Sequence, residues 1–151
     1  MGIDPGRHFG ITIIQSDRVD VVWGTFPSAS HEEYGRMAYD VLPFVFLVLE
    51  GDIPKWDIFM KQAFCYVEGA AYHDTYGQVG LAEVRFGFYL GMEHLGIRCK
   101  YIAPMSARKV AFGSAKIKAP DLWPVLNKNA ADSVGIAMAA WLKHPLRSDS
   151  M

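Results

Sequence analysis

The sequence lacks any hydrophobic run long enough to cross a membrane. The longest run, from Ile136 to Leu142, falls far short of the roughly 20 residues that a transmembrane helix needs. The sequence also lacks a basic segment followed by an apolar one at its start, so no secretory signal is visible. Internal repeats and low-complexity segments are absent as well. We therefore expect a soluble protein of the cytoplasm, in a bacterium or a phage-infected host cell, with no membrane partner.

Cysteine is scarce, with two residues in 151. Neither Cys65 nor Cys99 has the spacing of a metal ligand pair, and both stand among apolar or alternating residues, which favours two buried thiols over a disulfide. The 51% hydrophobic content is ample for one buried core. We expect a single domain over residues 1–143 and a loose C-terminal tail at 144–151.

A strong excess of positive charge is also missing, because the net charge is −1. Proteins that neutralise DNA phosphates usually have a basic surface, so this balance counts against a nucleic-acid enzyme. The distribution of the charges weakens this objection, because the segment 97–128 carries seven bases and one acid, Asp121. That segregation indicates either a positive face or an ordinary solvated surface. The bases are Arg98, Lys100, Arg108, Lys109, Lys116, Lys118 and Lys128.

The hydrophobic pattern predicts opening strands followed by alternating helices and strands. Apolar runs at 9–14 and 18–23 predict a hairpin, and the run at 63–67, apolar on both faces, predicts a central strand of a covered sheet. Ser30 and Glu33 have capping-box spacing at the start of a long helix, with Pro43 as a candidate kink. The predicted order is an α/β sandwich around a mixed sheet. Its helices are expected at 31–49, 74–95, 106–112 (capped by Ser106) and 129–142, with a strand at 98–103 and a basic loop at 113–120.

Three glycines recur on one face of the second long helix. Gly80, Gly87 and Gly91 are seven and four residues apart, so they are stacked on the same side. Each glycine weakens a helix by about 1 kcal/mol relative to alanine. This cost predicts a compensating close contact, either a helix crossing or a subunit interface.

Three acids stand at positions where active sites form. Asp4 ends a very short first strand, and Glu68 ends the apolar central strand, so both carboxylates are expected at a sheet edge. Asp132 is expected in the first turn of the last helix, three residues after Asn129 and on the same face. Such oxygen ligands suit a hard divalent cation. Taken singly, each residue also has an ordinary structural explanation as a turn residue, a helix cap or a partner of the helix dipole.

Several motifs together resemble the RuvC family of Holliday junction resolvases, over nearly the whole chain. The small size is more similar to a phage-type or otherwise compact member than to a typical bacterial one. The matching stretches are GIDPG at 2–6, YVEG at 66–69, YGQVGLAEV at 76–84, SARKVAFGSAKIK at 106–118 and NAADSVGIA at 129–137.

The resemblance implies a ribonuclease H-like fold, with a central mixed five-stranded sheet flanked by helices, and a homodimer. It also implies symmetric cleavage of a four-way DNA junction with two Mg²⁺ or Mn²⁺ ions per active site, leaving 5′-phosphate and 3′-hydroxyl ends. The acids of the family fall on Asp4, Glu68 and Asp132, and Asp4 is the candidate to bridge both ions. We expect the glycine face of the second helix, or its neighbour on the first two long helices, to supply the dimer contact.

The resemblance also assigns the basic segment to DNA phosphates, through Arg108, Lys109, Lys116 and Lys118. Lys116 is the candidate nearest the scissile phosphate and counts among the catalytic residues, although a loop lysine is ordinarily just solvated. Tyr72 and Tyr76 are candidates for stacking on unpaired bases, and His73 is a further DNA-binding candidate beside them. The alternative for these aromatic residues is ordinary packing.

One residue departs from the family pattern. Asn129 stands where the family has a fourth acidic or histidine metal ligand, and a neutral amide is a poorer partner for a hard cation. Either this member works with three acids, or the chain is an inactivated variant of a parent with aspartate there. A non-catalytic junction-binding protein and a ribonuclease H acting on RNA–DNA hybrids remain open alternatives. An actin-like ATPase is disfavoured, because 151 residues cannot hold its two large domains.

Overall fold

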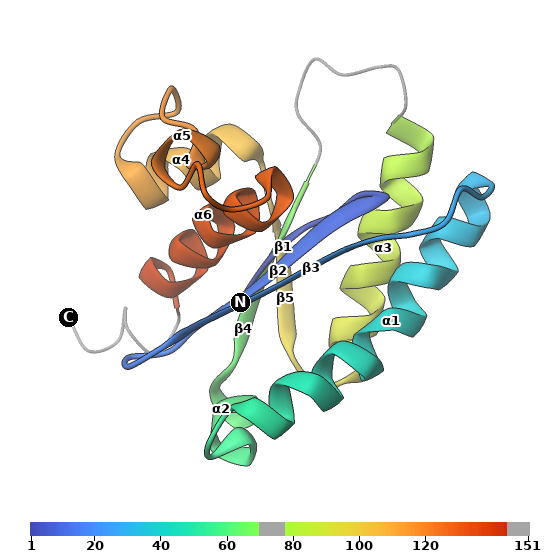
Figure 1. Ribbon diagram of the computed structural model, residues 1–151, viewed down its shortest axis with the longest axis horizontal. Coiled ribbons are helices and arrows are strands. Elements are labelled where there is room, and N and C mark those ends of the chain that lie inside the picture. Colours follow the sequence, from blue (N-terminus) through green and yellow to red (C-terminus); the bar gives the residue numbers. More distant parts are fainter. Residues whose placement is uncertain (70–77, 145–151) are drawn as a thin grey trace.

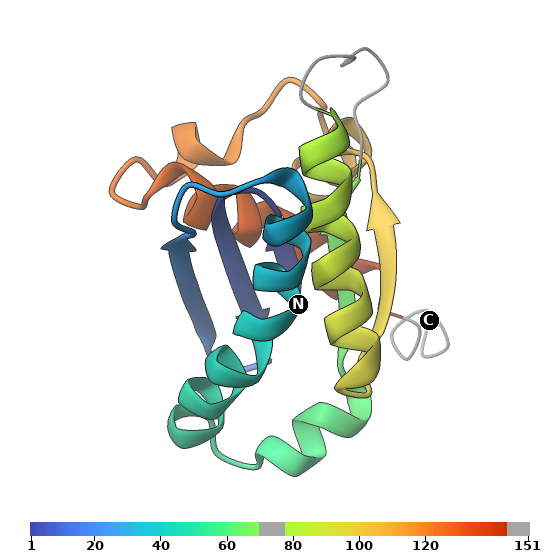
Figure 2. The same cartoon turned by 90° about the vertical axis from the view of Figure 1, so that its right-hand side faces the viewer.

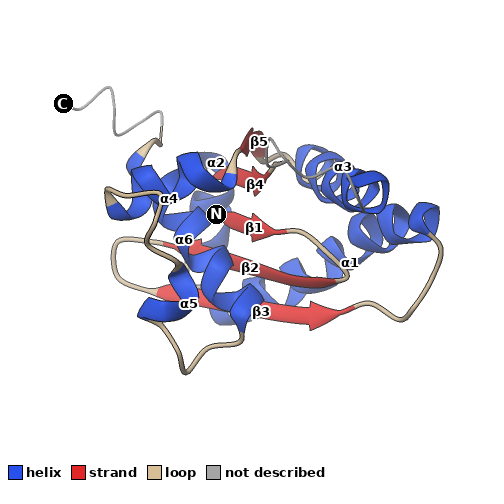
Figure 3. Cartoon of the chain, turned by 90° about the horizontal axis from the view of Figure 1, so that it is seen from above, coloured by secondary structure: helices blue, strands red, loops and turns tan. Residues whose placement is uncertain are grey.

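A computed structural model describes residues 1–69 and 78–144, with five strands in one sheet. The strands are β1 (Gly2–Asp4), β2 (His8–Ile14), β3 (Val19–Thr25), β4 (Phe64–Glu68) and β5 (Arg98–Ile102). Their order in the sheet is β3-β2-β1-β4-β5, as seen along the sheet in Figure 3. β3, β2 and β1 pair antiparallel, whereas β1, β4 and β5 pair parallel. The predicted mixed five-stranded sheet and its opening hairpin are therefore confirmed.

Helices cover both faces of this sheet (Figure 1). One layer consists of α1 (His31–Asp52) and α3 (Gln78–His94), which lie side by side in Figure 2. The other consists of α6 (Lys128–Leu142), which packs on β1, β2 and β4, with α4 (Pro104–Phe112) and α5 (Ala119–Leu122) beside it. A short helix, α2 (Trp56–Gln62), links α1 to β4.

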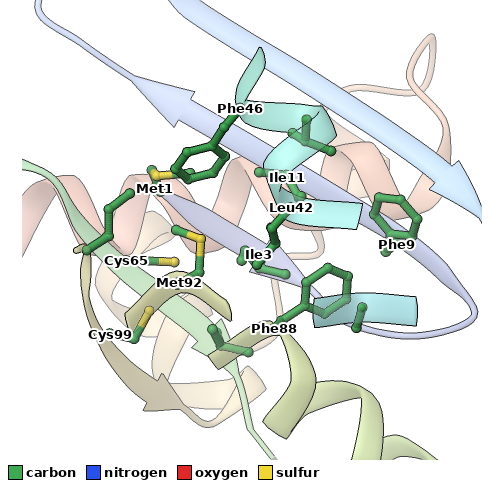
Figure 4. Packing of buried hydrophobic residues seen from close by; sticks show 14 of the residues in the cluster. Met1, Ile3, Phe9, Ile11, Leu42, Phe46, Cys65, Phe88, Met92 and Cys99 are labelled. Atoms are coloured by element: carbon green, nitrogen blue, oxygen red, sulfur yellow. The ribbon is translucent and has the colours of Figure 1, made fainter. Parts of the chain in front are cut away.

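The main core lies between the sheet and the α1–α3 layer (Figure 4). Ile3 and Ile11 of the sheet face Leu42 of α1 and Phe88 of α3, and all four are at most 1% exposed. Burying a side chain of this size contributes about 1.5–3 kcal/mol. Both cysteines are buried free thiols in the same core, as predicted.

The glycines of α3 permit a close helix crossing within the chain. A Cβ on Gly87 would overlap the Gly35 carbonyl oxygen of α1, and one on Gly91 would lie 2.6 Å from the Leu42 Cδ1 atom. The predicted close contact is thus confirmed as a helix crossing. The expectation that this glycine face supplies a dimer contact is wrong for Gly87 and Gly91, because α1 already occupies their face. The surroundings of Gly80 lie outside the described side chains.

Several element boundaries differ from the sequence-based prediction. The capping box of Ser30 and Glu33 is present, but α1 continues to Asp52, with Pro43 inside it. Helix α4 begins at Pro104 rather than at a Ser106 cap, since proline is favoured in the first turn, where its missing N–H has no partner. The predicted basic loop at 113–120 runs into the short helix α5, which begins at Ala119, and α2 was not anticipated. The predicted tail lies outside the described residues except for His144.

Candidate active site

Two acids lie level with each other where neighbouring parallel strands end. Asp4 is the last residue of β1 and Glu68 the last of β4, and the pairing of Ile3 with Val67 brings the two carboxylates to the same height. Ile3 and Val67 are fully buried in the core beside α1 and α3. Because side chains alternate along a strand, Asp4 and Glu68 belong to the opposite face, which α6 covers. The prediction that both acids lie at one sheet edge is confirmed.

Glycines bring α6 unusually close to the strand that carries Asp4. A Cβ on Gly2 would overlap the backbone of Ala137, and one on Gly10, the pairing partner of Asp4, would overlap the Asn129 carbonyl oxygen. Only glycine leaves room for the helix backbone at these two positions. The segment from Asn129 to Asp132 is therefore held directly above the end of β1.

A buried hydroxyl pair fixes α6 at this height. The hydroxyls of Thr12 on β2 and Ser133 on α6 are 2.7 Å apart, and the Ser133 hydroxyl also donates to the Ala130 carbonyl at 2.7 Å. The N-cap of α6 is Asn127, whose Oδ1 accepts from the Asn129 N–H at 2.9 Å. Asn127, and not Asn129, is therefore the residue that caps this helix. Asp132 consequently lies in the second turn of α6, one turn beyond Asn129, rather than in its first turn.

These residues meet in a cleft of about 490 Å³. Asp4, Glu68, Asn129 and Asp132 all line it, so the structure brings together the four predicted metal-site residues. Its cationic lining consists of Arg85 from α3, Arg108 from α4, and Lys118 and Lys128 from either side of α5. Leu81, Met105, Phe112 and Ile136 are among its apolar walls.

Burial and mutual repulsion dominate the electrostatics of the acids. Asp4 is only 8% exposed, and desolvation, with the nearby Glu68 and Asp132 carboxylates, raises its pKa well above the ordinary value. Desolvation and the charge of Asp132 raise the pKa of Glu68 to about 7. Desolvation also raises the pKa of Asp132. An acid cluster that is largely shielded from water, and whose carboxylates raise one another's pKa values, is typical of functional sites.

Nearby cations offset part of this repulsion. Lys128 lowers the pKa of all three acids, Arg108 that of Glu68 and Asp132, and Arg85 that of Asp4 and Glu68. The sequence reasoning missed Arg85 and Lys128 as site residues. Lys128 directly precedes Asn129, and Arg85 follows the YGQVGLAEV stretch, so both lie beside motifs that were already singled out.

The predicted DNA-binding residues separate into three groups. Arg108 and Lys118 line the cleft, whereas Lys109 and Lys116 are exposed and do not line it. Arg108 donates to the Ala115 carbonyl at 3.5 Å, and the Lys116 N–H donates to the Ser114 hydroxyl at 3.2 Å. The role of Lys116 next to the scissile phosphate therefore stays a prediction. Tyr72, His73 and Tyr76 lie outside the described residues.

The donor set of the cleft fits Mg²⁺ or Mn²⁺ held by pairs of acids. Within residues 1–69 and 78–144, no three acid, histidine or cysteine side chains are grouped closely enough to hold one ion together. Mg²⁺ is commonly bound by one or two carboxylates, with water and substrate phosphates completing its shell. The carboxylate of Asp4 interacts with those of Glu68 and Asp132, so each of these two pairs offers hard oxygen ligands. A cation bound to either pair would neutralise the repulsion between its two carboxylates.

A larger hollow of about 610 Å³ lies at the opposite end of the sheet, beside Met1, Phe64 and Trp141. Asp17 is the one acid among its described lining residues, so it lacks the acid grouping of the cleft. No helix in the described part of the chain is long and apolar enough to span a membrane.

The fold is that of RuvC, a ribonuclease H-like fold. The structure of RuvC from Thermus thermophilus matches with a TM-score of 0.62 at 16% identity, covering 97% of this chain and 95% of the other. A structure of the T. thermophilus protein in complex with a Holliday junction substrate matches with a TM-score of 0.61 at 14% identity, covering 93% and 90%. No protein-family model and no curated protein sequence matches this chain.

Proposed function

We propose that this protein is a divalent-metal-dependent endonuclease that resolves four-way DNA junctions. One observation carries the proposal: three carboxylates from β1, β4 and α6 line one cleft, with cations around them, on the fold of RuvC. The solved RuvC complex with a Holliday junction supports the choice of substrate. The likeness covers 97% of this chain and 95% of that of RuvC.

In this proposal, Asp4, Glu68 and Asp132 are the metal ligands. Asp4 faces both Glu68 and Asp132, and its strand β1 pairs with β4 and packs on α6, which makes Asp4 the candidate shared ligand. Two bound ions would supply an activated water and neutralise the leaving 3′ oxygen, which gives 5′-phosphate and 3′-hydroxyl ends. Arg108 and Lys118 are placed to hold the DNA backbone over the acids. Lys116 and Lys109 would extend this contact outside the cleft.

The pKa of Glu68 predicts a pH dependence for this chemistry. Because that pKa is about 7, a substantial fraction of the Glu68 carboxyl is protonated at neutral pH in the metal-free protein. A metal ligand must be deprotonated, so binding releases a proton and strengthens as the pH rises. Activity should therefore rise between about pH 6 and pH 8.

Asn129 favours one alternative function. Its neutral side chain lines the cleft beside Asp132, where an acid would add a fourth charged ligand. A protein with the junction-binding surface and a weakened metal site would bind junctions without cutting them. We keep this non-catalytic role as the second candidate for the chain as written.

The near two-fold symmetry of a four-way junction favours a homodimer, which places two identical sites on opposed strands. With the glycine face occupied, the outer face of α1 is the candidate contact. Phe44, Leu47 and Val48 follow each other at helical spacing and are 69%, 67% and 61% exposed. Large apolar side chains gathered on one exposed helix face mark an interaction surface. Sedimentation of a dimer at micromolar concentration would support this contact, and a monomer binding one junction would contradict it.

The decisive experiment compares the chain with Asn129→Asp and the matched control Asn127→Asp. Both variants add one negative charge at the start of α6, and aspartate is as good an N-cap as asparagine, but only residue 129 lines the cleft. Cleavage of a synthetic four-way junction, a linear duplex and an RNA–DNA hybrid is measured with Mg²⁺ and with Mn²⁺. We expect symmetric nicks in the junction, faster with Asn129→Asp and unchanged with Asn127→Asp.

Other outcomes decide between the remaining functions. Normal junction binding without cleavage of any substrate by Asn129→Asp would reject the nuclease and leave the non-catalytic binder. Preferential cleavage of the hybrid would identify a ribonuclease H activity instead. In the Asn129→Asp background, Asp4→Asn should abolish cleavage and preserve binding, and retained cleavage would remove Asp4 from the metal site.

A further inference from the structure

We propose that Arg85 binds a backbone phosphate of the DNA strand that is cut, from the wall of the cleft opposite the basic residues of α4 to α6. This inference rests on the proposed function, because it needs DNA in the cleft. It assigns a phosphate contact to α3, whereas the resemblance to resolvases and the basic segment of the sequence place their phosphate contacts in the opposite helical layer.

The position of Arg85 is set by one face of α3. Leu81, Arg85 and Tyr89 are four residues apart, so they lie along the same side of the helix, and the first two line the cleft. Tyr89 stacks on Tyr101 of β5, with ring centroids 4.7 Å apart and planes inclined by 22°. The Tyr89 hydroxyl also donates to the Cys99 carbonyl at 3.1 Å. These contacts fasten this side of α3 to the sheet one turn beyond Arg85.

Arg85 enters the cleft from α3, on one face of the sheet, whereas Arg108, Lys118 and Lys128 come from the layer on the other face. The charge of Arg85 lowers the pKa values of Asp4 and Glu68, the two acids at the strand ends. Arg108 acts on Glu68 and Asp132, and Lys128 acts on all three acids. The acids at the two strand ends are thus flanked by a cation from each helical layer.

This arrangement suits the binding of a phosphate. An anion above the acids would meet a guanidinium from α3 on one side and Arg108 or Lys118 from the other layer. A guanidinium offers two parallel N–H donors to two phosphate oxygens, which fixes the orientation of the group as well as its position. In-line attack requires that orientation. Arg85 would therefore contribute both to binding and to the geometry of cleavage.

The test uses Arg85→Gln, Arg85→Lys and a control, Arg98→Gln. Arg98 is an exposed arginine at the start of β5, level with Phe64 and so at the opposite end of the sheet from the cleft. The control removes the same charge from the chain. Affinity for a fluorescent four-way junction is measured by anisotropy in EDTA over a series of KCl concentrations, and single-turnover cleavage is measured in the Asn129→Asp background.

One phosphate contact contributes about 0.9 to the slope of log affinity against log salt, so Arg85→Gln should lower that slope by about 1. Arg98→Gln should leave the slope unchanged. Arg85→Lys keeps the charge, so it should keep the slope but slow cleavage about tenfold or more, because a lysine cannot form the paired contact. The lysine variant keeps the charge that the acids face, so it remains informative if the glutamine variant does not fold.

Two results would overturn the proposal while leaving the proposed function intact. The first is junction binding by Arg85→Gln with the slope of the unsubstituted chain, which would restrict Arg85 to a structural role beside the acids. The second is an equal loss of slope in Arg98→Gln, which would reduce the effect to net charge. Absence of junction binding by the unsubstituted chain would instead reject the proposed function itself, and this inference with it.

Discussion

Replacing Glu68 with glutamine should stabilise the metal-free protein at alkaline pH and leave it unchanged at acid pH. In the folded protein the pKa of Glu68 is raised from its ordinary 4.5 to about 7, first by desolvation and then by the charge of Asp132. The folded state therefore binds more protons than the unfolded chain between these two values. Stability falls as the pH rises through this window and is level above it.

The size of the effect follows from the same two values. A difference from 4.5 to about 7 corresponds to at most about 3 kcal/mol, at about 1.4 kcal/mol for each pH unit. Glutamine has nearly the shape of a protonated glutamate and never ionises, so Glu68→Gln should lose this pH dependence. For a chain of this length, 3 kcal/mol corresponds to an increase of about 6–12 °C in Tm.

The assay is thermal unfolding of both proteins in EDTA at pH 5 and pH 8, repeated with Mg²⁺ at pH 8. In EDTA, the variant should melt at a clearly higher temperature at pH 8, and the difference should be much smaller at pH 5, near the lower end of the window. With Mg²⁺, the unsubstituted chain should gain stability by metal binding and the variant should gain less. Equal melting temperatures at pH 8 in EDTA would show that Glu68 ionises without penalty. A gain that is the same at pH 5 would refute the electrostatic origin.

Three further substitutions test the packing of α6 over the site and the proposed dimer contact. Gly10→Ala should lower stability by about 2 kcal/mol and weaken stabilisation by Mg²⁺, because its Cβ overlaps the Asn129 carbonyl oxygen, whereas Gly51→Ala, with open space around it, should cost nothing in the same melts. Thr12→Val should lower Tm by about 2–4 °C, because it removes a buried hydrogen bond to Ser133 worth roughly 1 kcal/mol, and an unchanged Tm would contradict this. Leu47→Glu should convert the proposed dimer to a folded monomer in sedimentation, with Asp40→Glu on the same helix as the neutral control.

The sequence predicted most of the sheet because its strands have local signals. The hairpin of β2 and β3 shows as two apolar runs, and β4 is apolar on both faces because helices cover both of its sides. The two acids could be placed at one edge for the same reason, since each ends a strand. The sequence did not show how deeply these acids are buried. Only the packing of α6 on Gly2 and Gly10 reveals that Asp4 is almost fully buried.

Contacts between distant segments explain the errors. The glycine face of α3 predicted a close neighbour correctly, but a spacing pattern does not distinguish a helix of the same chain from one of another subunit. Arg85 was missed because an arginine in the middle of a helix resembles any solvated residue until β4 and β5 are placed beside it. The helix start at Pro104 was missed because Ser106, two residues later, is also a typical N-cap residue and was chosen instead.

The site and the fold oppose each other at the end of β1. Desolvation and repulsion at Asp4 and Glu68 disfavour the charged, metal-free protein, whereas the glycine contacts and the Thr12–Ser133 pair hold α6 over those acids. If α6 could move away from the sheet, water would solvate the carboxylates and the pKa values of Asp4 and Glu68 would fall. The buried hydroxyl pair therefore helps to keep the carboxylates buried and close together, and a bound divalent cation would relieve their repulsion. If the cleft binds metal as proposed, contacts outside it, such as the Thr12–Ser133 pair, therefore contribute to its affinity.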